Sequence, residues 1–212
     1  MPNWCNNNIT ISGDEGTIRT LTAVLKSIKT SDEEQSNNVF QSLIGLPQHM
    51  SDGDYKEKWY DTNIEWFGTK WDISYSEDMF NFSKNEISFS CETAWSPPIP
   101  FLQNLCEMYK VNANLFYSEG GVGFSGESTF NWVDGELEVY DDECGYLEGI
   151  YKYSREEFWS EVESRVDCIL DEEQTLEDFI SEFDFVSEED KEELTRLYNE
   201  TIKENDEESE GE

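Results

Sequence analysis

Residues 112–140, NANLFYSEGGVGFSGESTFNWVDGELEVY, contain three stretches suited to β-strands with two turn signals between them. Gly120-Gly121 separates residues 112–118 from residues 122–132, and Asp134-Gly135 separates these from residues 136–140. Glycine readily adopts the positive φ angles that tight hairpin turns require. This stretch therefore predicts a β-meander of three antiparallel strands.

The residues before the meander predict a further strand and a helix. From Glu86 to Glu92 polar and apolar residues alternate, as expected for a half-buried strand. Ser96 is a suitable helix cap, and Pro97-Pro98 suits a first helical turn, where backbone N–H groups have no helical partner. The helix expected next has apolar residues at helical spacing, namely Ile99, Leu102, Leu105, Cys106 and Tyr109.

The first part of the chain predicts a strand followed by a helix. Residues 8–12 (NITIS) have the pattern of a strand, and residues 13–16 (GDEG) that of a turn. Residues 39–46 form a short apolar segment, and residues 71–75 (WDISY) alternate like a strand. The first helix is expected to bury Ile18, Leu21, Val24, Leu25 and Ile28.

The resulting order is β-α-β-β-α-β-β-β, which contains the split βαβ arrangement of ferredoxin-like folds. We therefore expect an α+β domain over residues 1–153, with an antiparallel sheet, two helices on one face of it, and the β-meander as an extension.

After Tyr153 the apolar spacing becomes helical. Three segments begin with capping signals, Ser154-x-x-Glu157, Thr175-x-x-Asp178 and Ser187-x-x-Asp190. We predict an acidic helical extension over residues 154–204 and a disordered acidic tail over residues 205–212, which has no apolar residue. The apolar residues at helical spacing are Phe158, Val162 and Val166; Leu176, Phe179, Ile180 and Phe183; Leu194, Leu197, Tyr198 and Ile202.

Several motifs of residues 1–140 resemble those of the YubB-like family of phage and plasmid proteins. They are MPNWCNN at residues 1–7, WY at 59–60, FGTKW at 67–71, SCETAWSPP at 90–98, and YSE at 117–119 followed by GFSG at 123–126. The resemblance implies a ferredoxin-like domain and a mobile-element context. It implies no catalytic residue, and it does not extend to the acidic helical region.

The charge of the chain limits its partners. There are 49 acidic and 14 basic residues, a net charge of −35 in 212 residues. Residues 141–212 hold 28 of the acids and 6 of the bases, a net charge of −22. Neutralising phosphates requires lysine and arginine, so the sequence argues against direct nucleic-acid binding and favours a basic protein partner.

Other sequence features predict a cytoplasmic protein. Five scattered cysteines, without Cys-x-x-Cys spacing, argue against a disulfide framework or a zinc site. The N-terminus lacks a basic segment followed by an apolar run, and no stretch approaches the ~20 apolar residues of a membrane span.

No motif in the sequence predicts catalysis, a metal or a cofactor. The glycines of residues 120–126 lack the Gly-Lys-Ser/Thr ending of a phosphate loop, and His49 is a lone loop histidine. The acidic runs 141–143 and 171–173 lack calcium-loop spacing. An aromatic set is interpreted as a core cluster, with the Lys70 stem packing on an aromatic ring; its members are Trp59, Tyr60, Trp66, Phe67, Trp71 and Trp95.

The acidic helices remain as the candidate site, because like charges without partners cost stability on a helix surface. Either these acids form a solvated surface, or they imitate a phosphate array. For the second interpretation, Phe183, Phe185 and Tyr198 are the candidate apolar anchors. The candidate partner-binding acids are Glu156, Glu157, Glu161, Glu163, Asp171, Glu172, Glu173, Glu177, Asp178, Glu188, Glu189, Asp190, Glu192 and Glu193.

The expected function is a phage-type, non-enzymatic inhibitor. Its acidic helices would imitate nucleic acid and bind a basic site on a host defence or DNA-processing protein, as anti-restriction and anti-CRISPR proteins do. Two alternatives stay open: an antitoxin or immunity protein that neutralises a basic toxin, and an enzyme with a carboxylate-lined pocket for a small molecule.

Overall fold

A computed structural model describes residues 3–28, 38–169 and 175–209, without the side chains of Asp52 and of residues 165–169 and 204–209. The chain divides into two compact units, Met1–Cys144 and Gly145–Glu212. Helix α5 (Tyr146–Tyr153) lies in the second unit, whereas the sequence-based boundary after residue 153 assigns it to the first.

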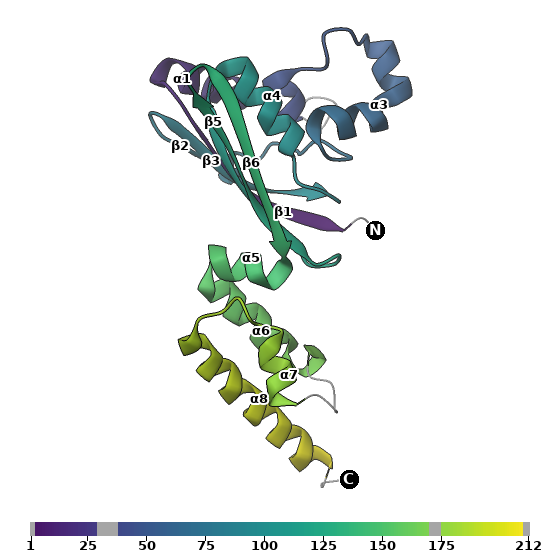
Figure 1. The fold of residues 1–212 in the computed structure, drawn as a ribbon. Coiled ribbons are helices and arrows are strands. Elements are labelled where there is room, and N and C mark those ends of the chain that lie inside the picture. Colours follow the sequence, from purple (N-terminus) through teal and green to yellow (C-terminus); the bar gives the residue numbers. More distant parts are fainter. Residues whose placement is uncertain (1–2, 29–37, 170–174, 210–212) are drawn as a thin grey trace. The chain divides into compact units, whose positions relative to one another are not determined.

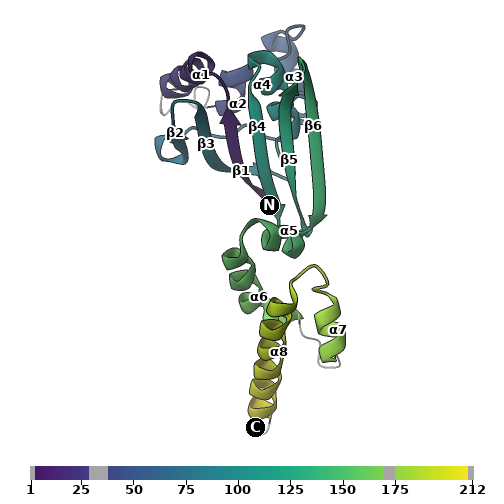
Figure 2. The ribbon, with the colours of Figure 1, turned by 60° about the vertical axis from the view of Figure 1, so that its left-hand side comes forward.

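The first unit is built on a six-stranded sheet. Its strands lie in the order β2-β3-β1-β4-β5-β6 and follow one another across the sheet in Figure 2. The pairings for which the register is defined are all antiparallel. The strands are β1 (Trp4–Ser12), β2 (Phe80–Phe82), β3 (Glu86–Ala94), β4 (Asn112–Glu119), β5 (Phe124–Val133) and β6 (Glu136–Gly145).

The register of β1 explains which face of the sheet is buried. Ile9 pairs with Phe89 of β3 on one side and with Leu115 of β4 on the other. These three side chains share one face because opposite residues of paired strands point to the same side. All three are at most 3% exposed. Since β1 lies between β3 and β4, the connection β3-α4-β4 crosses it and forms the split βαβ unit of a ferredoxin-like domain.

Two amphipathic helices, labelled α1 and α4 in Figure 1, have buried residues in the same core cluster as the sheet. Helix α1 (Glu15–Ser27) begins at Asp14, whose carboxylate accepts hydrogen bonds from Gly16 N and Thr17 N. Helix α4 (Ile99–Tyr109) follows the two prolines. The buried residues of the two helices are Ile18, Leu21 and Leu25, and Phe101, Leu102, Leu105 and Cys106. The ferredoxin-like α+β fold predicted from the sequence is confirmed.

Between α1 and β2, the described residues 38–79 contain two further helices and one 3-10 turn. They are α2 (Val39–Ile44), α3 (Asp52–Phe67) and η1 (Glu77–Met79). Helix α3 begins with a complete capping box between Ser51 and Asp54 and ends at Gly68, which has φ 83°. The apolar pattern of residues 52–67 does not predict a helix, because few residues of α3 face the core.

Three local predictions for the first unit are wrong. Residues 71–75 are not a strand, since among them only Ser74 makes a bridge, an isolated one with Asn38. The strand that pairs with β3 on the side away from β1 is β2. Ser96 does not cap α4, because its hydroxyl donates to Gly68 O at 2.6 Å and the residue before the helix is Pro98. Strand β1 begins at Trp4 rather than Asn8, since Trp4 already pairs with Ala94 of β3. The buried side chain of Asn7 donates to Cys5 O and Thr93 Oγ1.

The second unit consists of helices packed around a small apolar cluster. The helices are α5, α6 (Arg155–Ile169), α7 (Leu176–Ser181) and α8 (Glu188–Ser209). The Thr175 and Asp178 capping box is complete, and Ser154 Oγ and Ser187 Oγ accept from the N–H groups of Glu157 and Asp190. The buried residues of the cluster are Ile150, Phe158, Val162, Phe179, Phe183, Val186 and Leu194.

The acidic tail expected at residues 205–212 is helical over its first part, because α8 continues to Ser209. Extending an existing helix adds one hydrogen bond for each residue that is ordered, so it does not need an apolar residue in the last turn. Residues 210–212 lie outside the described part of the chain. Among the described residues, none of the helices is both long enough and apolar enough to cross a membrane.

Candidate functional site

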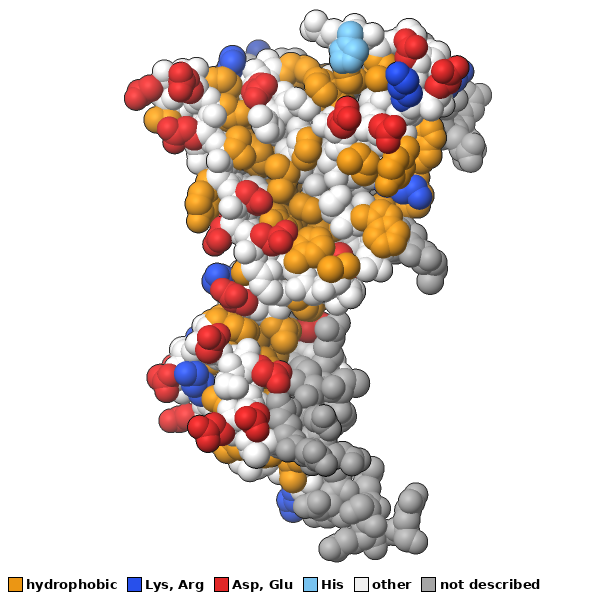
Figure 3. All heavy atoms as spheres, turned by 45° about the vertical axis from the view of Figure 1, so that its right-hand side comes forward, with side chains coloured by type: hydrophobic (Ala, Val, Ile, Leu, Met, Phe, Trp, Pro, Cys, Tyr) orange, Lys and Arg blue, Asp and Glu red, His pale blue; other side chains and the backbone are white. Residues whose placement is uncertain are grey.

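The second unit carries most of the predicted acidic surface. It holds 25 acids and 6 bases, a net charge of −19. Asp171, Glu172 and Glu173 lie outside the described residues. The remaining acids come from three helices: Glu156, Glu157, Glu161 and Glu163 from α6, Glu177 and Asp178 from α7, and Glu188, Glu189, Asp190, Glu192 and Glu193 from α8. Figure 3 shows acidic side chains on one face of this unit.

Part of this surface is neutralised within the unit. Lys152 pairs with Glu148, Lys191 with Glu188, and Arg196 with both Glu193 and Glu200. The expectation that the acids of α8 lack partners is therefore wrong for Glu188, Glu193 and Glu200. Apart from the capping residue Asp178, six other acids of the predicted set are exposed and join none of the ion pairs within the described part of the unit: Glu156, Glu157, Glu163, Glu177, Glu189 and Glu192.

Asp190 is buried rather than available to a partner, at 8% exposed. Its Oδ2 accepts hydrogen bonds from Tyr151 Oη at 2.6 Å and from Ser187 Oγ at 2.8 Å, and it also pairs with Arg155. The Tyr151 hydroxyl in turn accepts from Ser187 N and from Arg155 Nη2, both at 2.9 Å. This network ties α5 and α6 to the start of α8, so Asp190 holds the unit together.

The candidate apolar anchors are also internal. Phe183 is 1% exposed, and Phe185 and Tyr198 are partly buried against the same cluster. The ring of Phe185 lies 6.0 Å from that of Phe183, and the ring of Tyr198 lies 5.6 Å from that of Phe179. Their apolar spacing reflects the core of the unit.

The Asp190 network makes the second unit sensitive to acid. Burial by itself raises the pKa of Asp190, but the hydrogen bonds from Tyr151 and Ser187 and the charge of Arg155 hold that pKa below its ordinary value of 3.8. Below pH 3.8 the unfolded chain therefore binds a proton that the folded unit does not, so stability falls as the pH falls.

We expect Asp190→Asn to destabilise the unit at pH 7 by roughly 1–3 kcal/mol, because charge-assisted hydrogen bonds are lost. The difference between wild type and variant should shrink as the pH is lowered below 4, and urea unfolding monitored by circular dichroism at several pH values measures it. Asn199→Ala, an exposed substitution on α8, is the control. A pH-independent difference would contradict this role of Asp190.

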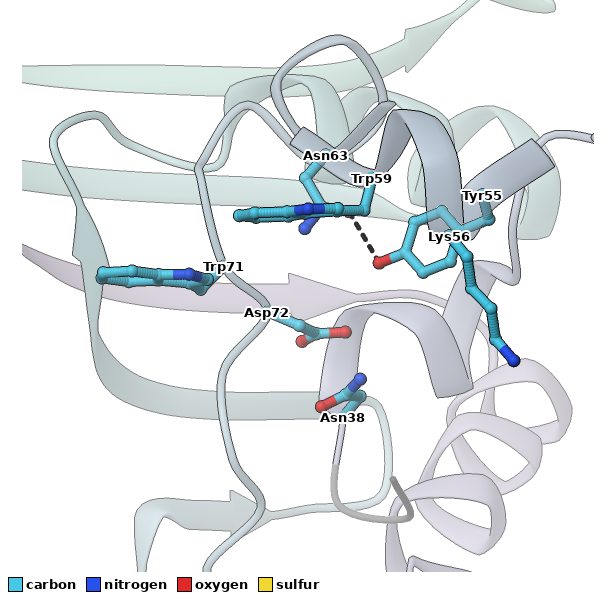
Figure 4. Close-up of a pocket in the computed structure, with 7 residues that line it drawn as sticks. All are labelled: Asn38, Tyr55, Lys56, Trp59, Asn63, Trp71 and Asp72. Carbon is cyan, nitrogen blue, oxygen red and sulfur yellow. Dashed lines mark hydrogen bonds between the residues drawn. The ribbon is translucent and has the colours of Figure 1, made fainter. Parts of the chain in front are cut away.

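A second candidate site is a pocket in the first unit. It has a volume of about 430 Å³ and is lined by residues of α3 and of the segments flanking it. Figure 4 shows the seven lining residues: Asn38, Tyr55, Lys56, Trp59, Asn63, Trp71 and Asp72.

The interpretation of the aromatic set as a core cluster is wrong for four of its six members. Trp59 and Trp71 are each 37% exposed, and Tyr60 and Trp95 are each 48% exposed. Only Phe67 is fully buried; Trp66 is partly buried, with its Nε1 donating to Gly45 O at 3.0 Å. Exposed tryptophans concentrated in one region of a protein commonly mark a binding surface. Lys70 does pack on an aromatic ring as expected, with its Nζ 4.4 Å from the Trp71 ring centre.

Asp72 is the one acid among the lining residues, and it is firmly held. Its Oδ1 accepts from Phe40 N at 2.8 Å and from Ile73 N at 2.7 Å, and its Oδ2 accepts from Gln41 N at 2.8 Å. Asp72 thus caps the first turn of α2, where Asn38 makes no capping hydrogen bond. Burial raises the pKa of Asp72 to about 6, although these hydrogen bonds act in the opposite direction.

Asn63 connects the pocket floor to the backbone. Its Oδ1 accepts from Tyr55 Oη at 2.9 Å, and its Nδ2 donates to Lys70 O at 2.9 Å. These bonds fix Tyr55 on one side of the pocket and the Lys70-Trp71 segment on another.

The other features considered from the sequence are the glycine-rich segment, the cysteines and His49. Gly120, Gly121 and Gly123 lie in the turn between β4 and β5, and Gly126 lies in β5. The carboxylate of Glu119 accepts from Gly121 N and Val122 N. Burial raises the pKa of Cys5, Cys91 and Cys106 to about 12, which keeps these thiols protonated. His49 is exposed in a turn, and the described residues contain no group of three or more His, Cys, Asp or Glu placed to hold a metal ion.

Sequence reasoning did not find the pocket residues Asn38, Tyr55, Asn63 and Asp72. One signal was available, since Ser51-x-x-Asp54 is a capping-box pattern that precedes the aromatic-rich segment. It indicates a helix there, but not which of its faces meets solvent.

Comparisons with known proteins give one solved structure and one family. A crystal structure of protein api92 from Yersinia pseudotuberculosis is similar to this chain, with 9% sequence identity, a TM-score of 0.37, and coverage of 69% of this chain and 98% of that one. No curated protein matches the sequence. The model of the ferredoxin-like domain in Api92-like proteins matches residues 70–199, which is more than half of the chain. The chain therefore belongs to the family defined by the ferredoxin-like domain of Api92-like proteins.

Proposed function

We propose that the protein is a non-enzymatic inhibitor whose acidic helical unit binds the basic, nucleic-acid-binding surface of a partner protein. One observation carries the proposal. The six unpaired acids project from helices that have their own apolar cluster and complete or partial caps. Acids held in this way present a fixed pattern, which a disordered acidic tail does not.

The distribution of cations supports the same function. Four basic residues of the second unit pair with its carboxylates: Lys152, Arg155, Lys191 and Arg196. Their positive charge therefore stabilises the helices from within, and Glu156, Glu163 and the other unpaired acids remain to attract a basic surface.

The charge density at the start of α8 can be compared with that of a nucleic acid. Residues 188–193 (EEDKEE) span about 7.5 Å along the helix axis, at a rise of about 1.5 Å per residue. Within this stretch Asp190 pairs with Arg155, Glu188 with Lys191 and Glu193 with Arg196, so Glu189 and Glu192 leave two net negative charges over that length. Duplex DNA carries one charge per about 1.7 Å, so the two densities are of the same order.

The resemblance of residues 1–140 to YubB-like phage and plasmid proteins favours a host factor in the cytoplasm as the partner, such as a restriction, CRISPR or DNA-processing protein. An antitoxin acting on a basic toxin would use the same surface, and the identity of the partner distinguishes the two.

Affinity capture from a host lysate tests the proposal. The full chain, immobilised at low salt, is expected to retain basic, nucleic-acid-binding proteins and to release them as the salt concentration rises, because exposed charges are screened. Recovery of no such protein at low salt would overturn the proposed function.

A further inference from the structure

The pocket of the first unit combines two flat indole faces with the carboxylate of Asp72, which backbone hydrogen bonds hold in place. In Figure 4 the rings of Trp59 and Trp71 are both seen edge-on and lie in nearly parallel planes, and the Asp72 carboxylate lies on the pocket side of the Trp59 ring. Lys56 also lines the pocket, but its ammonium group points away from Trp71 and Asp72. We infer that this pocket binds a guanidinium cation, such as the side chain of an arginine on a partner protein.

The aromatic faces favour a flat cation over other ligands. A guanidinium is planar, is weakly hydrated, and stacks on indole faces with both cation–π and stacking contacts. Lys70 already makes a cation–π contact with one indole, with its Nζ 4.4 Å from the ring centre of Trp71. The partial exposure of Trp59 and Trp71, at 37% each, leaves ring surface accessible.

The carboxylate supplies the complementary charge. A carboxylate has about four lone-pair positions, and three at Asp72 accept from Phe40 N, Gln41 N and Ile73 N. Oδ2 accepts only one of these three bonds, so it is the oxygen that a guanidinium N–H would approach. Because these three bonds hold the carboxylate in place, a cation would not have to order it on binding.

Charge also decides against a nucleotide, the other flat ligand that tryptophans stack on. A protein with a net charge of −35 repels an anionic phosphate and attracts a cation. This site is separate from the acidic helices, so its occupancy can be tested without reference to the proposed function.

Indole ¹⁵N NMR of the full chain tests the inference with a small probe, N-acetyl-arginine methylamide. The signals of Trp59 and Trp71 are expected to move with a Kd on the order of millimolar, whereas N-acetyl-lysine methylamide should bind more weakly. Trp59→Ala is expected to weaken binding of the arginine probe roughly fivefold or more. Trp95→Ala removes an exposed indole that does not line the pocket, and it should leave binding unchanged.

Three results would overturn the inference. The first is no movement of the Trp59 and Trp71 signals at roughly ten times the millimolar concentration expected to half-saturate the pocket. The second is equal binding of the lysine probe. The third is a shift caused by a nucleoside monophosphate but not by arginine. Asp72→Asn is a further variant that keeps the side-chain volume, and circular dichroism checks that α2 remains folded in it.

Discussion

Replacing Phe158 by alanine is expected to unfold the acidic helical unit under conditions in which the wild type is folded. Phe158 is fully buried and its ring contacts those of Tyr151, Trp159, Phe183 and Phe185 at centroid distances of 5.1–6.2 Å. Truncating a buried phenylalanine costs about 3–5 kcal/mol. A unit of this size has a total stability of roughly 3–10 kcal/mol at ~0.05–0.15 kcal/mol per residue.

Hydrogen exchange of the backbone amides of α6, α7 and α8 measures this effect. Phe158→Ala should remove most of their protection, and capture of the partner should be lost with it. Phe101→Ala is the matched control, because it empties the same volume in the core of the first unit. If Phe158→Ala left the helices protected, or abolished their protection without affecting capture, the ordered acidic unit would not be the binding element.

The second large effect is expected from neutralising the six unpaired acids. The variant carries Glu→Gln at positions 156, 157, 163, 177, 189 and 192. Each exposed charge pair contributes about 0.2–1 kcal/mol to an interaction, so removing six should weaken binding of the captured partner at least about tenfold at low salt. The variant should also show a flatter dependence of affinity on salt, which titrations at several salt concentrations measure.

A control with the same change of charge distinguishes a specific surface from net charge. Glutamine or asparagine replaces six exposed acids of the first unit: Asp61, Glu65, Glu77, Asp78, Glu107 and Glu136. This control should retain affinity. The Gln variant loses like-charge repulsion, but it also loses the favourable interaction of four first-turn glutamates with their helix N-termini. Circular dichroism therefore checks that its helices remain folded. Equal loss of affinity in the two variants would mean that only overall charge matters.

Several helices and strands of the fold could be predicted from local sequence patterns. The spacing of Ile18, Leu21 and Leu25 predicts α1, and the glycine turns at residues 120–121 and 134–135 predict the β4-β5-β6 meander. In these segments each residue pattern agrees with the burial that the tertiary structure imposes. The capping signals at Thr175 and Ser187 likewise predict where α7 and α8 begin.

The structure of the segment between α2 and β2 could not be predicted from the sequence. Its side chains bond to other parts of the chain and do not follow a regular apolar pattern. Asp72 alternates correctly for a strand in WDISY, but its carboxylate caps α2 from a distance of more than 30 residues along the chain. Tryptophan is a residue type expected in a core, yet Trp59 and Trp71 are each 37% exposed. Hydrophobicity alone does not tell which side of an aromatic helix is covered.

The sequence indicated which helices carry the acidic surface, but only some of the acids predicted for it are exposed. Glu156, Glu157 and Glu189 lie on exposed helical surface as expected, whereas Asp190 is drawn into a network with Tyr151 and Arg155. Local sequence shows Asp190 only as a capping residue of α8. Its partners lie 35 and 39 residues earlier in the chain, and packing alone brings them together.

The most direct test of the central claim is competition for the captured partner. If the acidic helices occupy a nucleic-acid-binding surface, duplex DNA and this protein should exclude each other from that partner. Added protein should then displace labelled DNA in proportion to its own affinity, and the six-fold Gln variant should fail to do so. A stable ternary complex, with DNA and this protein bound to the partner at the same time, would contradict the account.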